Sequence, residues 1–472
     1  MSTSRPIGMA APGGDARAEE LGAKLGAEYG AHLAILDRRL EEALAAAGLE
    51  GAVIFAGDEQ VVFRDDQTYP FVSEPYFKQW VPLTHAPGSF LRLVPGQRPM
   101  LVFKQVEDFW YEPPEDPSGY WTQHFDIRIA RSEAEARKLS GSGPRWVAVG
   151  EPASIPPPAT PQTQPAVNDA KFLSYLDYYR AVKTPYELLC MRAAQATAAR
   201  GHLAVAAALG PGVSELDLHN VYCKATEQRE TLLPYPSIVA LNEHGATLHY
   251  QHLRTRAPAV NRSLLIDAGA QHLGYAADIT RTWAAASDDF GTIIGSVEAL
   301  QQQVCREVKA GVDYVELHKL AHRLLGGVLR EHGLVRCGAE EAEALGITRA
   351  FLPHGLGHLL GLQVHDAGGR QVSADGARRE PPAADPYLRL TRVLEPGFVV
   401  TIEPGMYFIP ALMKALLARH ESKVNRAKIE RLLPFGGIRI EDDLEVTADG
   451  SKNLTREAFA ALGDHARNRD RH

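Results

Sequence analysis

Two aspartates lie within the stretch 263–282, whose other residues form runs typical of β-strands. We expect it to form a hairpin that turns at His272-Leu273 and sets Asp267 opposite Asp278 on one face. Opposed Cβ atoms in a hairpin lie about 5 Å apart, so two ionised carboxylates there repel each other. Such a pair is stable when it shares a proton or binds cations; a solvated hairpin end is the alternative.

Further acids follow two other strand-like runs. Glu403 ends the apolar run Val399-Val-Thr-Ile and is followed at once by Pro-Gly, a place where sheets often present functional side chains. A glutamate in a surface turn is the alternative interpretation. In the run 437–443, the two-residue period of a strand puts Arg439, Glu441 and Asp443 on one polar face.

Three histidines, His354, His358 and His365, occur within twelve residues among small and apolar neighbours. The glycines between them match neither a dinucleotide-binding loop nor a P-loop. His354 and His358 have the spacing of a zinc-binding protease helix, but the glutamate that should follow the first histidine is missing. The group favours a role at a metal or substrate over isolated structural histidines.

Four carboxylates and one imidazole, without sulfur, form an oxygen-rich ligand set suited to Mn²⁺, Co²⁺, Fe²⁺ or Zn²⁺ in a paired site. Their four negative charges would neutralise two divalent ions. Two such ions about 3.5 to 4 Å apart can share a bridging hydroxide, lower the pKa of its parent water and polarise a carbonyl under attack. These residues therefore predict a dinuclear-metal hydrolase.

The elements that position these residues are predicted to form two domains. Thr184 and Glu187 form a capping box, with Pro185 at the first helical position, and start a long helix through Leu209. We place the boundary there, with an N-terminal α/β domain at 1–183 and a catalytic domain at 184–472.

The N-terminal domain is expected to open with a disordered segment, 1–15, and an amphipathic helix, Ala16–Ala47. Its predicted strands are 52–55, 61–63, 89–94, 100–104 and 146–149, and a helix at 169–181 follows the Pro-rich segment 156–165. The catalytic domain is predicted to contain helices at 184–209, 214–229, 289–308 and 314–332. Its predicted strands, besides the hairpin, are 237–241, 247–249, 398–403 and 437–446, and 409–433 is interpreted as a surface insertion.

Composition narrows the classes of partner. A net charge of -8 and a pI near 6.1 argue against a general nucleic-acid partner, because phosphate binding requires a basic face. The sequence contains no run of about 18 apolar residues, the length that a helix needs to cross a bilayer. The four cysteines lie far apart without metal-site spacing, which favours a reducing compartment, so we expect a cytoplasmic protein.

Taken together, the motifs resemble the pita-bread metallopeptidases and, among them, the bacterial Xaa-Pro dipeptidases, or prolidases. The resemblance covers almost the whole chain and includes Asp65-Asp66, Tyr235-Pro-Ser-Ile, Leu248-His-Tyr250, the 263–282 hairpin, His354-Gly-Leu-Gly-His358, Tyr387-Leu-Arg-Leu-Thr-Arg392, Thr401-Ile-Glu-Pro-Gly-Met-Tyr-Phe408 and Phe435-Gly-Gly-Ile-Arg-Ile-Glu-Asp442. It implies an α+β fold, in which a pita-bread (creatinase/aminopeptidase-like) catalytic domain follows a smaller α/β N-terminal domain.

The resemblance implies two metal ions per subunit, usually Mn²⁺, with Asp278 and Glu441 bridging them. The implied ligands are Asp267, Asp278, His358, Glu403 and Glu441. Cleavage of an Xaa-Pro dipeptide would release proline, and a side activity on organophosphorus triesters occurs in some enzymes of this type.

Other residues take roles around the substrate in this resemblance. His354 would lie near it, His249 and His365 would contact it and the tetrahedral intermediate, and Arg389 would bind its C-terminal carboxylate. The remaining positions are Arg439, which braces the metal shell, Tyr235, which lines the pocket, and Asp66, in the Asp65-Asp66 region that reaches the site of a second subunit. A homodimer with dimer and substrate-opening contacts in the N-terminal domain is therefore implied.

Physical reasoning agrees with these roles. The arginine fork of Arg389 binds two carboxylate oxygens at once, and Glu403 is the expected general base because it borders the water without having to bridge. Two alternatives remain open. An aminopeptidase P would trim longer peptides that begin with Xaa-Pro, and a metal-free pita-bread module would bind a partner, although such modules usually lack one or more ligands.

Overall fold

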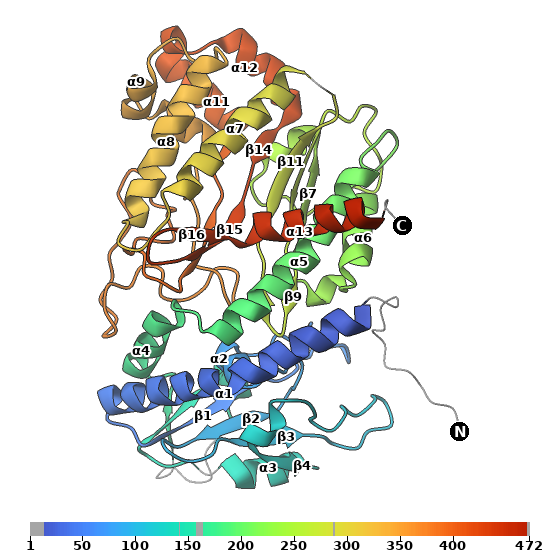
Figure 1. Ribbon diagram of the computed structural model, residues 1–472, viewed down its shortest axis with the longest axis vertical. Helices are drawn as coiled ribbons and strands as arrows, with labels where there is room; N and C mark the ends of the chain where they lie inside the picture. Colours follow the sequence, from blue (N-terminus) through green and yellow to red (C-terminus); the bar gives the residue numbers. More distant parts are fainter. Residues whose placement is uncertain (1–13, 141, 157–163, 287, 470–472) are drawn as a thin grey trace. The chain divides into compact units, whose positions relative to one another are not determined.

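The computed structural model describes residues 14–140, 142–156, 164–286 and 288–469 (Figure 1). Two compact units are present, one of Met1–Leu176 with Thr184–Cys190 and one of Asp177–Lys183 with Met191–His472. The predicted domain boundary between residues 183 and 184 stays a prediction. Residues 1–13 and 157–163, where the disordered segment and most of the Pro-rich segment were expected, lie outside the described residues.

The first unit contains a six-stranded sheet in the order β4-β3-β2-β1-β5-β6. Its strands are β1 (Gly51–Phe55), β2 (Phe90–Leu93), β3 (Met100–Lys104), β4 (Asp126–Ala130), β5 (Trp146–Val149) and β6 (Ala166–Val167). Its helices include α1 (Gly14–Ala47), α2 (Pro75–Trp80) and α3 (Glu133–Ser140), and α4 (Ala170–Arg180) follows. The expected α/β architecture of this part of the chain is confirmed.

Helix α1 forms for the reason that its sequence indicates. Leu25, Tyr29, Leu36 and Leu40 are all at most 4% exposed, because three- and four-residue spacing places them on one buried stripe.

The strand predicted at 61–63 is wrong. Val61 makes only an isolated bridge to Thr68, and the Val62 N–H donates to the carbonyl of Gln67 at 2.9 Å, so this segment pairs with itself in a short loop and joins no sheet.

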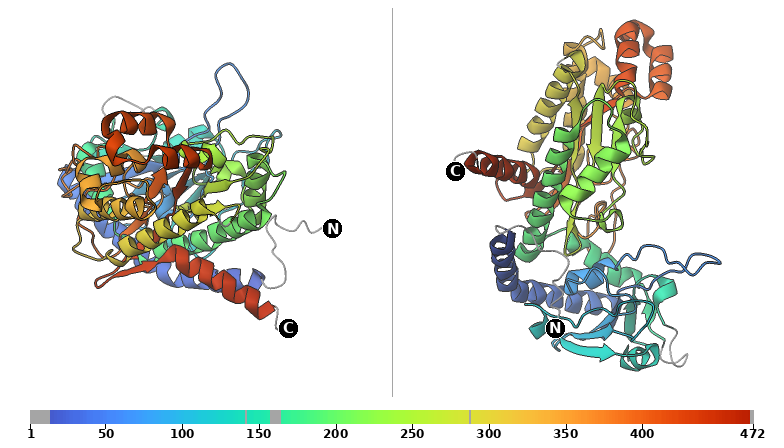
Figure 2. Two further views of the ribbon diagram at one scale, coloured as in Figure 1. Left: turned by 90° about the horizontal axis from the view of Figure 1, so that it is seen from above. Right: turned by 90° about the vertical axis from the view of Figure 1, so that its right-hand side faces the viewer.

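The second unit combines small antiparallel sheets with long helices (Figures 1 and 2). Its strands are β7 (Ile238–Leu241), β8 (Ser263–Asp267), β9 (Gln271–His272), β10 (Tyr275–Ala276), β11 (Thr280–Ala284), β12 (Val399–Ile402), β13 (Gly405–Tyr407), β14 (Gly437–Arg439), β15 (Asp442–Val446) and β16 (Ser451–Asn453). Its first helix is the part of α5 (Pro185–Ala208) that follows Cys190. The other helices are α6 (Glu215–Thr226), α7 (Asp289–Arg306), α8 (Tyr314–Glu331), α9 (Ala339–Ala344), α10 (Ile347–Phe351), α11 (Pro410–His420), α12 (Arg426–Leu432) and α13 (Leu454–Arg469). Helix α7 lies against β11, β12 and β14. Among the described residues, no helix is both long and apolar enough to span a membrane.

The predicted hairpin is present, but its register differs from the prediction. Asp267 pairs with Thr280, and His272 pairs with Tyr275. The turn therefore lies at Leu273-Gly274, where φ is 51° and 87°, and both positive angles suit a two-residue hairpin turn. Asp278 lies two residues from the position opposite Asp267. The two aspartates still share a face, because a shift of two residues leaves every side chain on its original face.

The predicted strand 437–446 is divided in two. Strand β14 pairs with β13, and β15 pairs with β12. At the break between them, Glu441 forms a bridge with Thr280 on β11. This bridge joins the hairpin to the second block of strands and brings Glu441 toward the two aspartates.

The interval 409–433 is more than the surface insertion that we expected. It forms α11 and α12 and supplies buried side chains to the main core of the second unit. Its core residues are Met413, Leu416, Leu417, Val424, Ile429 and Leu432. Burial of these apolar groups stabilises the unit, so this interval belongs to its core.

A buried ionic contact anchors the segment that carries the three histidines. Arg180 Nε donates a 3.0 Å hydrogen bond to Asp366 Oδ1, and Lys183 Nζ donates a 3.0 Å bond to Asp366 Oδ2. The Asp366 N–H donates to the carbonyl of Leu359 at 2.9 Å. All three charged side chains are at most 3% exposed. The end of α4 therefore fixes the residue next to His365.

We predict that Asp366→Ala lowers the free energy of unfolding by about 3 to 5 kcal/mol, because it leaves two buried cations without their counter-charge. Urea denaturation followed by circular dichroism would measure the change. Asp449→Ala, in an exposed turn, is the control and should leave the unfolding midpoint unchanged. An Asp366→Ala midpoint equal to that of the parent would contradict the stabilising role of this contact.

Candidate metal centre

The two aspartates of the hairpin meet at one phenol. Tyr235 donates its hydroxyl proton toward Asp267 Oδ1 at 2.8 Å and Asp278 Oδ1 at 2.6 Å. Arg439 Nη2 donates a 2.6 Å hydrogen bond to Asp267 Oδ2. The backbone N–H of Asp278 donates to Asp443 Oδ2 at 2.8 Å. The structure thus brings both predicted aspartate ligands together and fixes their orientation.

The other three predicted ligands lie beside this pair. Asp278, His358 and Glu441 are buried, and each offers a ligand atom within 4.8 Å of the other two. His358 Nε2 is 3.5 Å from Asp278 Oδ2 and 3.5 Å from Glu403 Oε1. Glu441 Oε2 accepts a 2.6 Å hydrogen bond from the hydroxyl of Thr280. All five predicted ligands therefore belong to one cluster.

The orientation of His358 suits a metal ligand. Its Nδ1 lies 3.0 Å from the carbonyl oxygen of Leu359. A carbonyl can only accept, so Nδ1 carries the proton and Nε2 faces the carboxylates with its lone pair when the ring is neutral. The backbone N–H of His358 donates to Thr401 Oγ1 at 3.0 Å, which holds the residue beside β12.

The electrostatics of the cluster reflect several like charges in a buried space. Burial, together with the charge of Asp278, raises the pKa of Glu403 to about 7 despite the opposing effect of His358. Burial and the charge of Asp278 also raise the pKa of Glu441 well above its usual value. Burial acts to lower the pKa of His358, but the nearby Asp278 and Glu403 raise it to about 9. These residues fit divalent cations, because a cation would stabilise the charged carboxylates and take the Nε2 lone pair.

Three of the predicted substrate residues surround the cluster. His354 Nδ1 lies 3.9 Å from Glu403 Oε2, and the ring centroids of His358 and His365 are 4.5 Å apart. Burial is the main cause that lowers the pKa of His354 to about 3, and the charge of Arg439 adds to it. Burial is also the main cause that lowers the pKa of His365 to about 4, and the charge of His358 adds to it. His249 contributes to both shifts, so it lies near both rings.

His249 and Arg389 are exposed. The strand predicted at 247–249 is wrong, because a short helix at Asn242–Ala246 and a turn occupy this part of the chain. Arg389 contributes to the lowered pKa of His365 and therefore lies near it. Asp66 lies in an exposed turn of the first unit, and its predicted role at the site of a second subunit stays a prediction.

Sequence reasoning missed two supporting residues. The Tyr407 hydroxyl accepts a 2.8 Å hydrogen bond from Arg439 Nη1 and lies 2.9 Å from His354 Nε2. Asp443 was placed on the polar face of its strand but received no role, although it accepts hydrogen bonds from the Asp278 N–H and from Gln195 Nε2. The alternation of polar residues after Gly437 was the signal for Asp443, and Tyr407 lies within the run 401–408 of the family resemblance, which gave it no role.

Comparisons with known proteins agree with this arrangement. The family model "Metallopeptidase family M24" matches residues 189–448, and the model "Xaa-Pro dipeptidase, N-terminal domain" matches residues 27–178. An Xaa-Pro dipeptidase of Stenotrophomonas maltophilia strain K279a is 47% identical over 439 residues, which cover 92% of this chain and 98% of that protein. An Xaa-Pro dipeptidase of Xanthomonas euvesicatoria pv. vesicatoria strain 85-10 is 48% identical over 436 residues, with the same coverage of both chains.

Solved structures establish the fold. Zinc-substituted aminopeptidase P of E. coli in complex with product has a TM-score of 0.68 and 23% identity and covers 92% of this chain and 97% of its own. Proline aminopeptidase P II of Yersinia pestis has a TM-score of 0.68 and 24% identity, with coverage of 92% and 96%. The pita-bread fold that the sequence predicted, preceded by a smaller N-terminal domain, is confirmed.

The raised pKa of Glu403 makes the metal-free protein sensitive to pH. Its folded pKa, about 7, lies above the unfolded value of about 4.3, so ionisation of this group destabilises the fold as pH rises between those values. We predict that metal-free Glu403→Gln gains thermal stability over the metal-free parent as pH rises from about 4.5 to about 7. Thermal unfolding in chelator across that range measures the difference. Exposed Glu316→Gln should follow the parent at every pH, and a Glu403→Gln curve parallel to the parent would refute the linkage.

Proposed function

The chain belongs to metallopeptidase family M24, and from this premise we propose that it is an Xaa-Pro dipeptidase that hydrolyses the bond before proline with two bound metal ions. The observation that carries the proposal is the buried cluster of Asp278, His358 and Glu441, joined by Asp267 and Glu403. The relatives of 47% and 48% identity, which are named Xaa-Pro dipeptidases, support the substrate class.

We propose that this centre would hold two Mn²⁺ ions and that Asp278 and Glu441 would each bind both. The proposed ligands are Asp267, Asp278, His358, Glu403 and Glu441. Bound there, the ions would polarise the scissile carbonyl and lower the pKa of a water molecule. The oxygen-rich ligand set supports a hard ion such as Mn²⁺.

Glu403 is the proposed general base. Its side chain is 18% exposed, whereas residue Glu441 is 2% exposed, so Glu403 borders the space that a substrate can enter. It also lies close to both His354 and His358. A carboxylate in this position can take a proton from water and give it to the proline nitrogen, which must gain a proton as its bond to the carbonyl carbon breaks.

His249 and His365 are the proposed hydrogen-bond donors to the substrate and to the oxyanion, and His354 is proposed to lie near the substrate. Removal of one donor of this kind commonly costs about 3 kcal/mol of transition-state stabilisation. Tyr407 orients His354, since its hydroxyl accepts from Arg439 Nη1 and can donate to His354 Nε2. His354 can in turn donate its Nδ1 proton to the carbonyl of Gly355, 2.8 Å away.

Substrate recognition is proposed to depend on Arg389. Its exposed guanidinium near His365 can bind both oxygens of the dipeptide carboxylate. Tyr235 lines the pocket while it holds Asp267 and Asp278, and Arg439 braces Asp267.

The remaining expectations belong to the same proposal. Residues 1–183 would form the N-terminal domain with dimer and substrate-opening contacts, and residues 184–472 the catalytic domain. In a homodimer, Asp66 would approach the site of the second subunit. The four unpaired cysteines favour a cytoplasmic location. Hydrolysis of organophosphorus triesters would use the same activated water.

The direct test is proline release from Leu-Pro by protein supplied with Mn²⁺. We predict that chelation abolishes the release and that Glu403→Gln lowers kcat by a factor of about 10³ or more, through loss of the base and a metal ligand. Glu380→Gln, on an exposed loop, is the control and should retain full activity. A metal-loaded parent that releases no proline would overturn the proposal.

A substitution of Arg389 distinguishes a dipeptidase from an aminopeptidase P. We predict that Arg389→Ala lowers kcat/KM for Leu-Pro by a factor of about 10² to 10³, mainly through KM, because a carboxylate loses its charged partner. Cleavage of a longer peptide that begins with Xaa-Pro should be slow in the parent and little changed in the variant. Exposed Arg378→Ala is the control. Faster cleavage of the longer peptide than of Leu-Pro by the parent would instead support an aminopeptidase P.

A further inference from the structure

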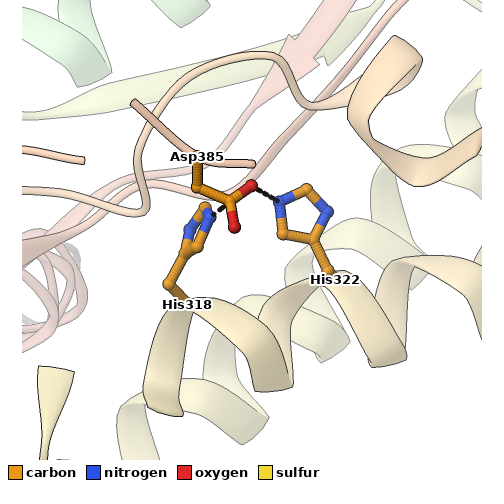
Figure 3. A group of neighbouring side chains, drawn as sticks. All are labelled: His318, His322 and Asp385. Carbon is orange, nitrogen blue, oxygen red and sulfur yellow. Dashed lines mark ion pairs between the residues drawn. The ribbon is translucent and has the colours of Figure 1, made fainter. Parts of the chain in front are cut away.

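A second group of metal-ligating side chains lies in the second unit, apart from the five proposed ligands. His318 and His322 stand one turn apart on α8, and Asp385 comes from the loop before Arg389 (Figure 3). The histidine rings face the carboxylate, with Nε2 of His318 and of His322 at 3.4 Å and 4.0 Å from Asp385 Oδ1. The two histidine side chains are 1% exposed and that of Asp385 is 7% exposed.

Three of the four ring nitrogens of these histidines make no hydrogen bond, and the two Nε2 atoms have only Asp385 as an ion-pair partner within the described part of the chain. Among the described residues, His318 Nδ1, His318 Nε2 and His322 Nε2 are buried without a hydrogen bond. Buried polar atoms in folded proteins are nearly always paired, so three such atoms at one place require an explanation. Two of them, the Nε2 atoms, point toward the same carboxylate oxygen.

The surroundings of His322 and Asp385 resemble an outer shell around a metal. His322 Nδ1 lies 3.1 Å from the hydroxyl of Thr348. With the proton on Nδ1, Nε2 presents its lone pair to an oxygen that also carries lone pairs, and a cation between them would remove that repulsion. Arg349 donates from Nε to Asp385 Oδ1 at 2.7 Å and from Nη2 to Oδ2 at 3.0 Å, which fixes the carboxylate plane.

We propose that His318, His322 and Asp385 form a binding site for one divalent transition-metal ion, Zn²⁺, separate from the proposed catalytic ions. Tetrahedral zinc with bonds of about 2.0 to 2.1 Å places its ligand atoms about 3.3 Å apart. The 3.4 Å between His318 Nε2 and Asp385 Oδ1 matches this spacing, whereas the 4.0 Å between His322 Nε2 and the same oxygen would shorten when the ion binds. Two imidazoles and one carboxylate leave the fourth position for a water molecule. The i, i+4 spacing on α8 supplies both imidazoles from one helix face.

The ion would fix the segment that carries Arg389. The N–H of Leu388 donates to the carbonyl of Asp385 at 3.1 Å, and the same segment packs closely on Gly355, where an added Cβ would lie 2.8 Å from Leu388 Cα. A zinc ion on Asp385 would therefore connect α8 to the loop beside His354 and Arg389. Its role is structural, since it positions this loop and does not touch the substrate.

The test must separate this ion from the catalytic pair. We would therefore first change Asp278→Asn and Glu441→Gln together in the full-length chain, which removes the two central ligands of the proposed catalytic site. After equilibrium dialysis against Zn²⁺, this chain should retain about one ion, measured by plasma mass spectrometry, and its zinc K-edge absorption should show only nitrogen and oxygen ligands.

Adding His322→Gln to that background should abolish zinc retention. His332→Gln is the matched control, because this histidine caps the same helix and contacts Ser296 instead of Asp385. Zinc retention that is absent from the folded background chain, or that His322→Gln does not change, would overturn the proposal.

If the double change prevents folding, the parent chain and His322→Gln alone carry the test. The variant should then bind about one zinc ion fewer than the parent, and equal zinc content would overturn the proposal. Proline release by the parent is independent of this result, so failure of the zinc site and failure of the dipeptidase proposal are distinguishable.

Discussion

Mutual repulsion of carboxylates in a buried space is the constraint on which the centre of the second unit depends. The four acids are Asp267, Asp278, Glu403 and Glu441. Arg439 and His358 supply positive charge within the cluster, but burial and repulsion still raise the pKa of Glu403 to about 7 and that of Glu441 well above its usual value. A protein keeps such an arrangement when cations complete it, which is why the ligand set, the fold and the family membership all support metal-dependent hydrolysis.

The surrounding fold makes this close approach feasible through hydrogen bonds and small residues. Tyr235 reaches both hairpin aspartates, and a Cβ on Gly269 would lie 2.1 Å from the carbonyl of Ala277 and 2.7 Å from the Tyr235 ring. Only glycine fits at that position. The Thr280 bridge to Glu441 then joins two strand blocks that are distant in sequence. These contacts fix the positions of the proposed ligands, as catalysis by bound ions would require.

The sequence was most informative where local patterns decide the structure. The α1 stripe, the capping box of Thr184 and Glu187 and the presence of the 263–282 hairpin were all predicted and are confirmed. The hairpin register was wrong because Leu273 adopts a positive φ that nothing in its residue type indicates, and this moved the turn by one residue. The strand predicted at 437–446 was too long, because its break at Glu441 arises from pairing with two different partner strands.

By itself, the sequence determined the type of centre to expect: acids in strand-like runs and clustered histidines offer a hard, oxygen-rich set of candidate ligands, whatever the exact pairing. Only the tertiary structure decided which groups complete and support it. Tyr407 joins His354 to Arg439, and Asp443 braces Asp278, through contacts between distant segments. The same is true of Asp385 beside His318 and His322. Local patterns govern helices and turns, whereas contacts between distant side chains depend on how the whole chain packs, and no short stretch of sequence contains that information.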